Sequence, residues 1–253
     1  MNAMRRFSKL FLLGAIVVVL TSLNASAAGI TEQQAEAILN ELKQIRLLLE
    51  KQQAPNSANA VRPATPYETA KITVGDIYAL GANDAPVTLV EFTDYQCPFC
   101  NQFHRLTFPE LKKTYIDTGK IRFISRDLPL EFHNNALLAA RAARCAGEQD
   151  KYWELRHVLS SNPNNLSKQA ILNYAQDLSL DTKQFQACLD SEKYREEVQK
   201  DVMDAQSIGI TGTPGFVLGR SSKHTLEGIK IVGAQPFTLF DAKIKELLAG
   251  TPH

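Results

Sequence analysis

The order of apolar and polar positions in the middle of the chain predicts a strand, a helix and a second strand. Residues 87–92 form a β-branched and apolar run with the length of a buried strand. Apolar residues then recur at helical spacing over residues 99–115, and residues 121–125 form another strand-like run. Together these segments predict a strand–helix–strand unit.

The second half of the chain predicts helices followed by a return to strands. Helical spacing recurs in four consecutive segments, which cover residues 134–144, 153–159, 167–178 and 181–204. Strand-like runs follow at 215–218 and 229–232, and a last helix begins near Pro236. The chain is therefore predicted to hold an α/β domain over residues 72–253, with a helical insert at about 133–207.

A separate helix is predicted near the N-terminus, within residues 28–54. Residues 31–53 contain neither Gly nor Pro, and Thr31 followed by Gln34 predicts a capping box at the helix start. Apolar residues recur at spacings of three and four, as in a coiled-coil seam, at Ala35, Ile38, Leu42, Ile45 and Leu49. An isolated helix of this length is marginal in water, so it must pack on something. Docking on its own domain is one alternative, and the seam favours the other, a homo-oligomer formed through residues 31–53.

The segments on either side of this helix are predicted to be a signal peptide and a linker. Residues 1–27 carry a basic start, an uncharged apolar run and the small residues Ala25, Ser26 and Ala27, as secretory signals do. An uncleaved membrane anchor is the alternative, but polar residues shorten the apolar run below the roughly 20 residues of a span. Residues 55–71 are rich in Pro and small polar residues, which predicts a semi-rigid linker. The protein is therefore expected to be periplasmic or secreted, with cleavage near Ala27.

The net charge does not indicate a strongly charged partner. Removing residues 1–27 takes away three basic residues and leaves 25 Lys plus Arg against 27 Asp plus Glu. Nucleic-acid binding depends on a clustered basic face, so nucleic acid is not an expected partner of this nearly neutral chain.

The strongest chemical signal is the motif Cys97-Pro98-Phe99-Cys100 at the predicted strand-to-helix junction. A thiolate in the first turn of a helix is stabilised by free backbone N–H groups and by the helix dipole, so Cys97 is expected to be the nucleophile. Two intervening residues put Cys100 within disulfide reach, so Cys100 is expected to resolve a mixed disulfide. The alternatives are a purely structural disulfide and half of a zinc site, but the chain has no second C-x-x-C motif. No metal or cofactor is therefore predicted.

The two remaining cysteines, Cys145 and Cys188, fall on separate predicted helices of the insert. Four cysteines in an oxidising compartment can form two disulfides, so this pair is predicted to be a structural bridge. Two buried free thiols and a second redox pair remain as alternatives.

Four separated segments resemble the DsbA-like branch of the thioredoxin superfamily. They are VEFTDYQCPFC, LPLEFHNNALLAARAARCA, QACLDSEKY and TGTPGF, and the resemblance covers about residues 72–249. It implies a thioredoxin-like fold with a helical insertion, preceded here by the N-terminal helical segment. It also implies that Pro214 is a cis proline beside the active-site cysteines, and that the backbone of Thr213 pairs with an extended client chain. Taken alone, residues 212–215 predict only a turn.

The same resemblance implies roles for three further positions. Glu91, six residues before Cys97, matches the family's buried acid that moves protons to and from the resolving cysteine, and an acid at a water-facing strand end is the alternative. Phe99 stands where the best-known oxidases of the family have histidine, so Cys97 is expected to be less acidic, and the couple less oxidising, than in those oxidases. Thr213 resembles the threonine that precedes the cis proline in disulfide isomerases.

These observations predict an exported thiol-disulfide oxidoreductase that acts on unfolded or misoxidised client proteins. The direction of exchange stays open. A monomeric oxidase would be reoxidised by a membrane redox partner, whereas an isomerase would stay reduced and gain from several active sites in one oligomer. Similar helical extensions in isomerase-like members favour the second. From another class, a chaperone or a metal-binding protein would use the CPFC cysteines for binding rather than for turnover.

Overall fold

The protein has two units, which are described separately. The structure is a computed structural model that describes residues 31–53, 67–75, 78–222 and 224–250. The units are Met1–Pro63 and Ala64–His253. The predicted signal peptide lies outside the described residues, as does most of the predicted linker. Within the described ranges no helix is both long and apolar enough to cross a membrane.

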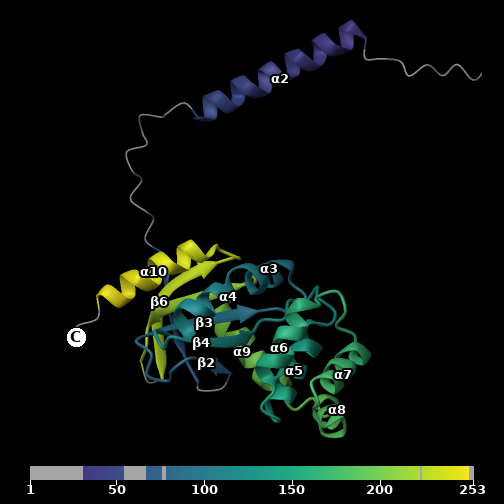
Figure 1. The fold of residues 1–253 in the computed structure, drawn as a ribbon, viewed down its shortest axis with the longest axis vertical. Coiled ribbons are helices and arrows are strands. Elements are labelled where there is room, and N and C mark those ends of the chain that lie inside the picture. Colours follow the sequence, from purple (N-terminus) through teal and green to yellow (C-terminus); the bar gives the residue numbers. More distant parts are fainter. Residues whose placement is uncertain (1–30, 54–66, 76–77, 223, 251–253) are drawn as a thin grey trace, which may run out of the picture. The chain divides into compact units, whose positions relative to one another are not determined.

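A six-stranded sheet forms the centre of the second unit (Figure 1). In spatial order its strands are β1 (Thr69–Thr73), β6 (Thr225–Val232), β5 (Gly215–Arg220), β3 (Val87–Thr93), β4 (Ile121–Asp127) and β2 (Ala79–Leu80). β3 and β4 are parallel, and the other neighbours are antiparallel. The parallel pair is the predicted strand–helix–strand unit, because parallel strands need a crossover connection.

β1 corrects the predicted end of the linker. The linker is predicted to continue to residue 71, but β1 begins at Thr69 and pairs with β6. Positions along β1 alternate between exposed and buried, with Ala70 and Ile72 facing the core. This alternation is only five residues long and directly follows a Pro-rich tract, so the sequence pattern does not separate the strand from the linker.

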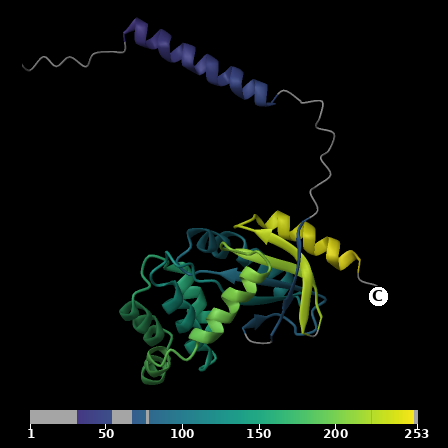
Figure 2. The same cartoon turned by 180° about the vertical axis from the view of Figure 1, so that it is seen from behind.

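Helices cover both faces of the sheet. One face carries α3 (Pro98–Leu106), α4 (Phe108–Leu111), η1 (Lys112–Ile116) and α10 (Phe237–Ala249), which share a core with the strands. The other face carries α9 (Arg195–Ser207), which crosses in front of the sheet in Figure 2. β3 is therefore buried along its whole length. Leu89 lies in the core shared with α3, α4, η1 and α10, and Val90 lies in the core shared with α9.

The helix predicted over residues 99–115 is interrupted. α3 ends at Leu106, α4 begins at Phe108, and the short π-helix η1 completes the segment. Pro109 has no N–H to donate, and its ring would clash with the carbonyl four residues earlier, so a single α-helix cannot run through it. At the break, the hydroxyl of Thr107 donates to the carbonyl of Gln235 at 3.0 Å.

The helical insert lies between β4 and β5. It contains α5 (Ala136–Gly147), α6 (Tyr152–Ser161), α7 (Lys168–Asp177), α8 (Thr182–Asp190) and α9. The segment predicted over residues 181–204 therefore forms two helices, α8 and α9. Alanine side chains on α5 let the neighbouring helices approach closely, so the insert has a core of its own. α9 contributes to this core through Val198 and reaches the sheet through Ala205.

In the first unit, α2 (Glu32–Gln53) begins with the predicted capping box. The N–H of Thr31 donates to Gln34 Oε1 at 3.1 Å, and the N–H of Gln34 donates to Thr31 Oγ1 at 3.3 Å. Four large apolar side chains of this helix are at least half exposed within the single chain: Ile38, Leu39, Leu42 and Ile45. The side chain of Leu49, the last position of the seam, lies outside the described residues.

Candidate active site

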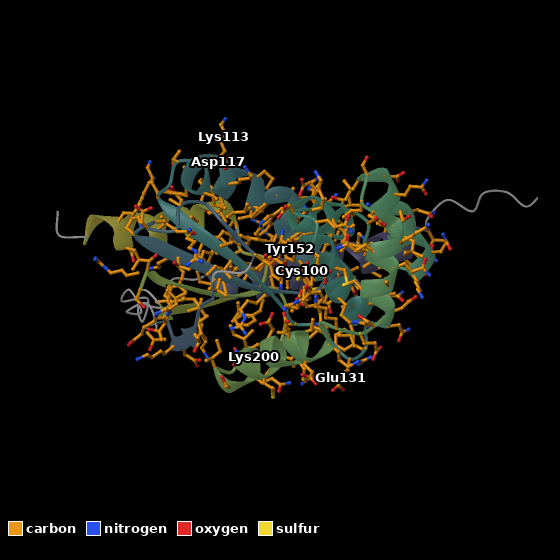
Figure 3. The ribbon with its side chains drawn as sticks, turned by 90° about the horizontal axis from the view of Figure 1, so that it is seen from below. Cys100, Lys113, Asp117, Glu131, Tyr152 and Lys200 are labelled. Atoms are coloured by element: carbon orange, nitrogen blue, oxygen red, sulfur yellow. A yellow bond between two sulfur atoms is a disulfide. The ribbon has the colours of Figure 1, made fainter. Side chains whose placement is uncertain are left out.

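The two cysteines of the motif begin helix α3. Cys97 is the N-cap residue of α3 and has extended backbone angles, and Pro98 follows at the first helical position. Proline is favoured there because its missing N–H has no partner in the first turn and its fixed φ suits a helix. Both thiols are free and buried. In Figure 3 Cys100 lies near the centre of the second unit, whereas Lys113 and Glu131 lie at its margin.

The pKa values of the two thiols shift in opposite directions. A hydrogen bond from the Cys100 thiol is the largest cause that lowers the pKa of Cys97, to about 5, and the backbone N–H groups of Phe99 and Cys100 act in the same direction. Burial raises the pKa of Cys100, and the bond to Cys97 and the charge of Glu91 raise it further. Cys97 is therefore a thiolate at neutral pH, while Cys100 keeps its proton.

The loop before β5 lies against Cys97. The Cys97 Sγ is 3.3 Å from the carbonyl oxygen of Thr213, and the peptide bond between Thr213 and Pro214 is cis. The carbonyl of Pro214 accepts a hydrogen bond from the N–H of Gly233 at 2.9 Å. Residues that are 116 positions apart in the sequence are thus brought together at the thiol.

Glu91 is buried in the sheet, and it pairs with a residue that the sequence analysis missed. Its side chain is 1% exposed, so it does not sit at a water-facing strand end. Its Oε2 accepts a hydrogen bond from Nη2 of Arg156, a 2% exposed residue of α6. Burial raises the pKa of Glu91, while the charge of Arg156 opposes this rise. Because the partner lies 65 residues away on a different element, no local pattern could identify it.

Asp94 is a second site residue that the sequence analysis missed. It follows β3, and its N–H lies 3.4 Å from the Cys100 Sγ. Its carboxylate accepts hydrogen bonds from the N–H of Gln96 at 2.7 Å and of Leu130 at 2.8 Å, and it pairs with His133 Nδ1 at 2.8 Å. Asp94 thereby fixes the loop after β4 to the segment that leads into the cysteines. Its position directly after a buried strand and just before the motif was the sequence signal that could have identified Asp94 as a site residue.

Phe99 lies between the two cysteines and points away from the interior, with 58% of its side chain exposed. Only its backbone N–H acts on the Cys97 thiolate. The expectation that Cys97 is less acidic than in oxidases with histidine at this position stays a prediction.

Cys145 on α5 and Cys188 on α8 form a disulfide inside the core of the insert. Their sequence separation is 43, and closing a loop of this length stabilises the fold by about 4 kcal/mol in the chain-entropy model. In the described part of the chain, no three His, Cys, Asp or Glu side chains are grouped so that they could hold a metal ion.

Comparisons with known sequences identify the domain type. A family model described as thioredoxin matches residues 73–230. Part of the Na⁺/H⁺ antiporter NhaA 3 of Salinispora tropica is 32% identical over 161 residues, which are 63% of this chain and 24% of that protein. The chain thus spans about a quarter of the length of the antiporters that it matches. A probable disulfide bond formation protein D of Bacillus anthracis is 29% identical over 161 residues, which are 60% of this chain and 74% of the relative.

Solved structures point the same way. The crystal structure of Wolbachia pipientis α-DsbA1 is 26% identical with a TM-score of 0.62, and the match covers 70% of this chain and 94% of that one. Oxidised BdbD of Bacillus subtilis is 27% identical with a TM-score of 0.57, and the match covers 68% and 92%. Since the family model also covers more than half of the sequence, the chain belongs to the thioredoxin family and is a DsbA-like member of it.

Proposed function

We propose that the protein is an exported thiol-disulfide oxidoreductase that exchanges disulfides with client proteins through Cys97 and Cys100. Cys97 attacks a client sulfur and forms a mixed disulfide. Cys100 then attacks the Cys97 Sγ, and the client leaves as a thiolate. The observation that carries the proposal is the placement of two free thiols at the start of α3, with the Cys97 Sγ 3.3 Å from the carbonyl oxygen of Thr213. The opposite pKa shifts of the two thiols, lowered for Cys97 and raised for Cys100, agree with this placement. One sulfur is ready to attack at neutral pH, and the other stays protonated until resolution.

The proposed clients are unfolded or misoxidised proteins. An extended client segment can add to the backbone of the loop at Thr213 and Pro214 as a short strand, with its sulfur beside Cys97. The exposed ring of Phe99 offers an apolar contact next to the same sulfur. A folded surface would lack the extended backbone that this arrangement needs.

An oxidising compartment is proposed as the site of action. The disulfide between Cys145 and Cys188 supports this location, because such bonds persist outside the reducing cytosol. Residues 1–27 have the pattern of a secretory signal, and a membrane redox partner would restore the working state of the Cys97/Cys100 pair.

A homo-oligomer formed through residues 31–53 is also proposed. The exposed apolar side chains of α2 follow the coiled-coil spacing, and an apolar stripe of this kind favours pairing with copies of itself. Replacing Leu42 at the seam by Asp is expected to dissociate the oligomer in light scattering. Replacing Asn40, on the opposite side of the helix, by Asp is the matched control and is expected to leave the mass unchanged. A monomeric parent chain would contradict the proposal.

The deciding experiment is reactivation of a model protein with scrambled disulfides. Three chains are compared: residues 28–253, the same chain without residues 28–54, and its Cys97→Ala variant. Reactivation that needs both Cys97 and the N-terminal helix identifies an oligomeric isomerase. If none of the chains changes the disulfides of any client, the proposed activity is wrong.

An oxidase is the second candidate. The low pKa of Cys97 favours it, because a stabilised thiolate makes the reduced pair more stable and its disulfide a stronger oxidant. The name of the relative in Bacillus anthracis, which refers to disulfide bond formation, points in the same direction. Rapid oxidation of a reduced client without reactivation of a scrambled one would identify this direction.

A further inference from the structure

Asp94 lies between the end of β3 and the cysteine motif, and it holds the turn that leads into α3. Its carbonyl oxygen accepts a hydrogen bond from the N–H of Cys97 at 3.1 Å, and its Oδ1 accepts one from the N–H of Gln96 at 2.7 Å. A carboxylate that accepts from the N–H two residues later forms an Asx turn, which fixes the backbone of the aspartate itself. The turn therefore sets the direction in which the N–H of Asp94 points.

The second carboxylate oxygen ties this turn to the loop after β4. Asp94 Oδ2 accepts a hydrogen bond from the N–H of Leu130 at 2.8 Å and lies 2.8 Å from His133 Nδ1. The Asp94 side chain is 0% exposed, so these protein groups hold it in place of water. We refer to the contacts of the carboxylate with Gln96, Leu130 and His133 as the Asp94 clamp. A segment distant in the sequence thereby braces the approach to the motif.

The backbone N–H of Asp94 points at the resolving sulfur. It lies 3.4 Å from the Sγ of Cys100, a residue that is 4% exposed. Burial, the bond to Cys97 and the charge of Glu91 raise the pKa of Cys100, whereas the N–H of Asp94 acts in the lowering direction. A hydrogen bond to the ionised form of an acid favours that form. A donor is thus in place where the charge of the Cys100 thiolate develops.

We propose that Asp94 is a positioning residue for the resolving step, in which the Asp94 clamp fixes its N–H so that this donor stabilises the thiolate of Cys100. The inference rests on the proposed function and adds to it a role for the loop after β4. The buried carboxylate acts through its own backbone and touches neither sulfur.

The resolving step balances as follows. The Cys100 thiol releases its proton to water, the Cys100 thiolate attacks Cys97 Sγ, and the bond between Cys97 and the client sulfur breaks. The electron pair of that bond leaves with the client as a thiolate, which takes up a proton from water. The charge on Cys100 exists only within a buried site, where a fixed N–H donor stabilises it more than a mobile one would.

The test measures the resolving step by itself. The chain of residues 28–253 is reacted with glutathione disulfide, and release of glutathione from the Cys97 mixed disulfide is followed from pH 6 to pH 10 by rapid quenching and mass spectrometry. Asp94→Ala removes the whole clamp, and Asp94→Asn keeps one oxygen that can still accept from the loop after β4. Glu131→Gln is the matched control, because Glu131 is an exposed acid on the same loop and lies at the margin in Figure 3. The rate of Cys97 alkylation by iodoacetamide reports on the attacking thiol in every variant.

Asp94→Ala is expected to slow release about tenfold at pH 7, which is the effect of losing one hydrogen bond to a charged group. The deficit is expected to narrow as the pH rises, because Cys100 then ionises without the donor. Asp94→Asn is expected to be slowed less than Asp94→Ala, Glu131→Gln is expected to keep the wild-type rate, and Cys97 alkylation is expected to change far less than release.

Three results would overturn the proposal. One is release from Asp94→Ala at or above the wild-type rate, which would mean that the carboxylate acts on Cys100 by charge repulsion. Another is a deficit of the same factor at every pH, which would mean that the variant only misplaces the sulfur. The third is an Asp94→Asn chain as slow as Asp94→Ala.

A second variant keeps the test decisive if Asp94→Ala does not fold. His133→Ala removes one contact of the clamp at a side chain that is 18% exposed, and it leaves Asp94 in place. It is expected to slow release in the same pH-dependent way by a smaller factor, and a wild-type rate would count against the clamp. If the wild-type chain itself forms no mixed disulfide with glutathione, the proposed function fails, which is a different result from a fast Asp94 or His133 variant.

Discussion

The acidity of Cys97 couples the stability of the reduced protein to pH. The pKa of Cys97 is lowered from 9.0 to about 5 in the folded state. A depressed pKa contributes stability that is complete above the unfolded value and is lost as the pH falls through the folded value. At about two pH units above the folded pKa, Cys97 is ionised at pH 7 in the folded state, while the unfolded thiol is still protonated. The thiolate therefore contributes about 3 kcal/mol to the free energy of unfolding at pH 7. Through the redox couple this corresponds to about 60 mV toward a stronger oxidant.

The assay is urea unfolding at pH 7, 6, 5 and 4 of the oxidised chain and of the chain reduced only at Cys97 and Cys100. Mass spectrometry confirms that the other disulfide is intact. Subtracting the oxidised from the reduced free energy of unfolding removes the pH dependence of all groups that the two forms share. The pKa of Cys100 is raised, so its thiol stays protonated in both states over this window and adds nothing to the difference.

The reduced form is expected to lose about 3 kcal/mol relative to the oxidised form between pH 7 and pH 4. A Cys97→Ser variant has no thiolate to protonate and cannot form the disulfide, so it is compared directly with the oxidised parent chain and is expected to show no such loss. An iodoacetamide alkylation profile gives an independent midpoint, which should lie near pH 5. A pH-independent difference, or an alkylation midpoint near that of a free thiol, would refute the attribution of the low pKa to this site.

Three further predictions concern other residues. Phe99→His places a cation beside the thiolate and is expected to lower the pKa of Cys97 by about one unit, which raises the reduction potential by roughly 30 mV against glutathione. Arg144→Met leaves the buried carboxylate of Asp127 without its cation, while Asp201 keeps Arg126, and it is expected to lower the free energy of unfolding by about 3–5 kcal/mol in urea. The double variant Cys145→Ala/Cys188→Ala is expected to lose about 2–4 kcal/mol while thiol exchange with glutathione at folded chains is retained. Exchange that is abolished in the folded double variant would contradict a purely structural bridge.

The sequence predicted the parts of the site that are local. The motif at Cys97 and Cys100 lies within four residues, and its chemistry follows from its place at a strand-to-helix junction. The place of Thr213 and Pro214 beside Cys97 came from the family resemblance, because a turn-like tetrapeptide carries no information about a cysteine that lies 116 positions before Thr213.

The parts that were missed depend on tertiary packing. Arg156 looks like any polar residue of an amphipathic helix, and only the docking of α6 on the sheet brings it to Glu91. Asp94 looks like a residue that ends a strand, although its carboxylate serves three donors. β1 was missed for a different reason, because five alternating residues after a Pro-rich tract are too short for a periodic signal.

The order of the cysteines along the chain has a consequence for the proposed export. Cys145 and Cys188 are joined to each other, and Cys97 and Cys100 both precede them, so the two pairs follow one another without interleaving. Four cysteines allow three pairings. In this one the first cysteine of the chain pairs with the second, and the third pairs with the fourth. A chain that crosses a membrane with its N-terminus first can therefore close each pair as it arrives. It then needs no disulfide isomerase to rearrange an earlier non-native bond, which suits a protein that is itself proposed to exchange the disulfides of other proteins.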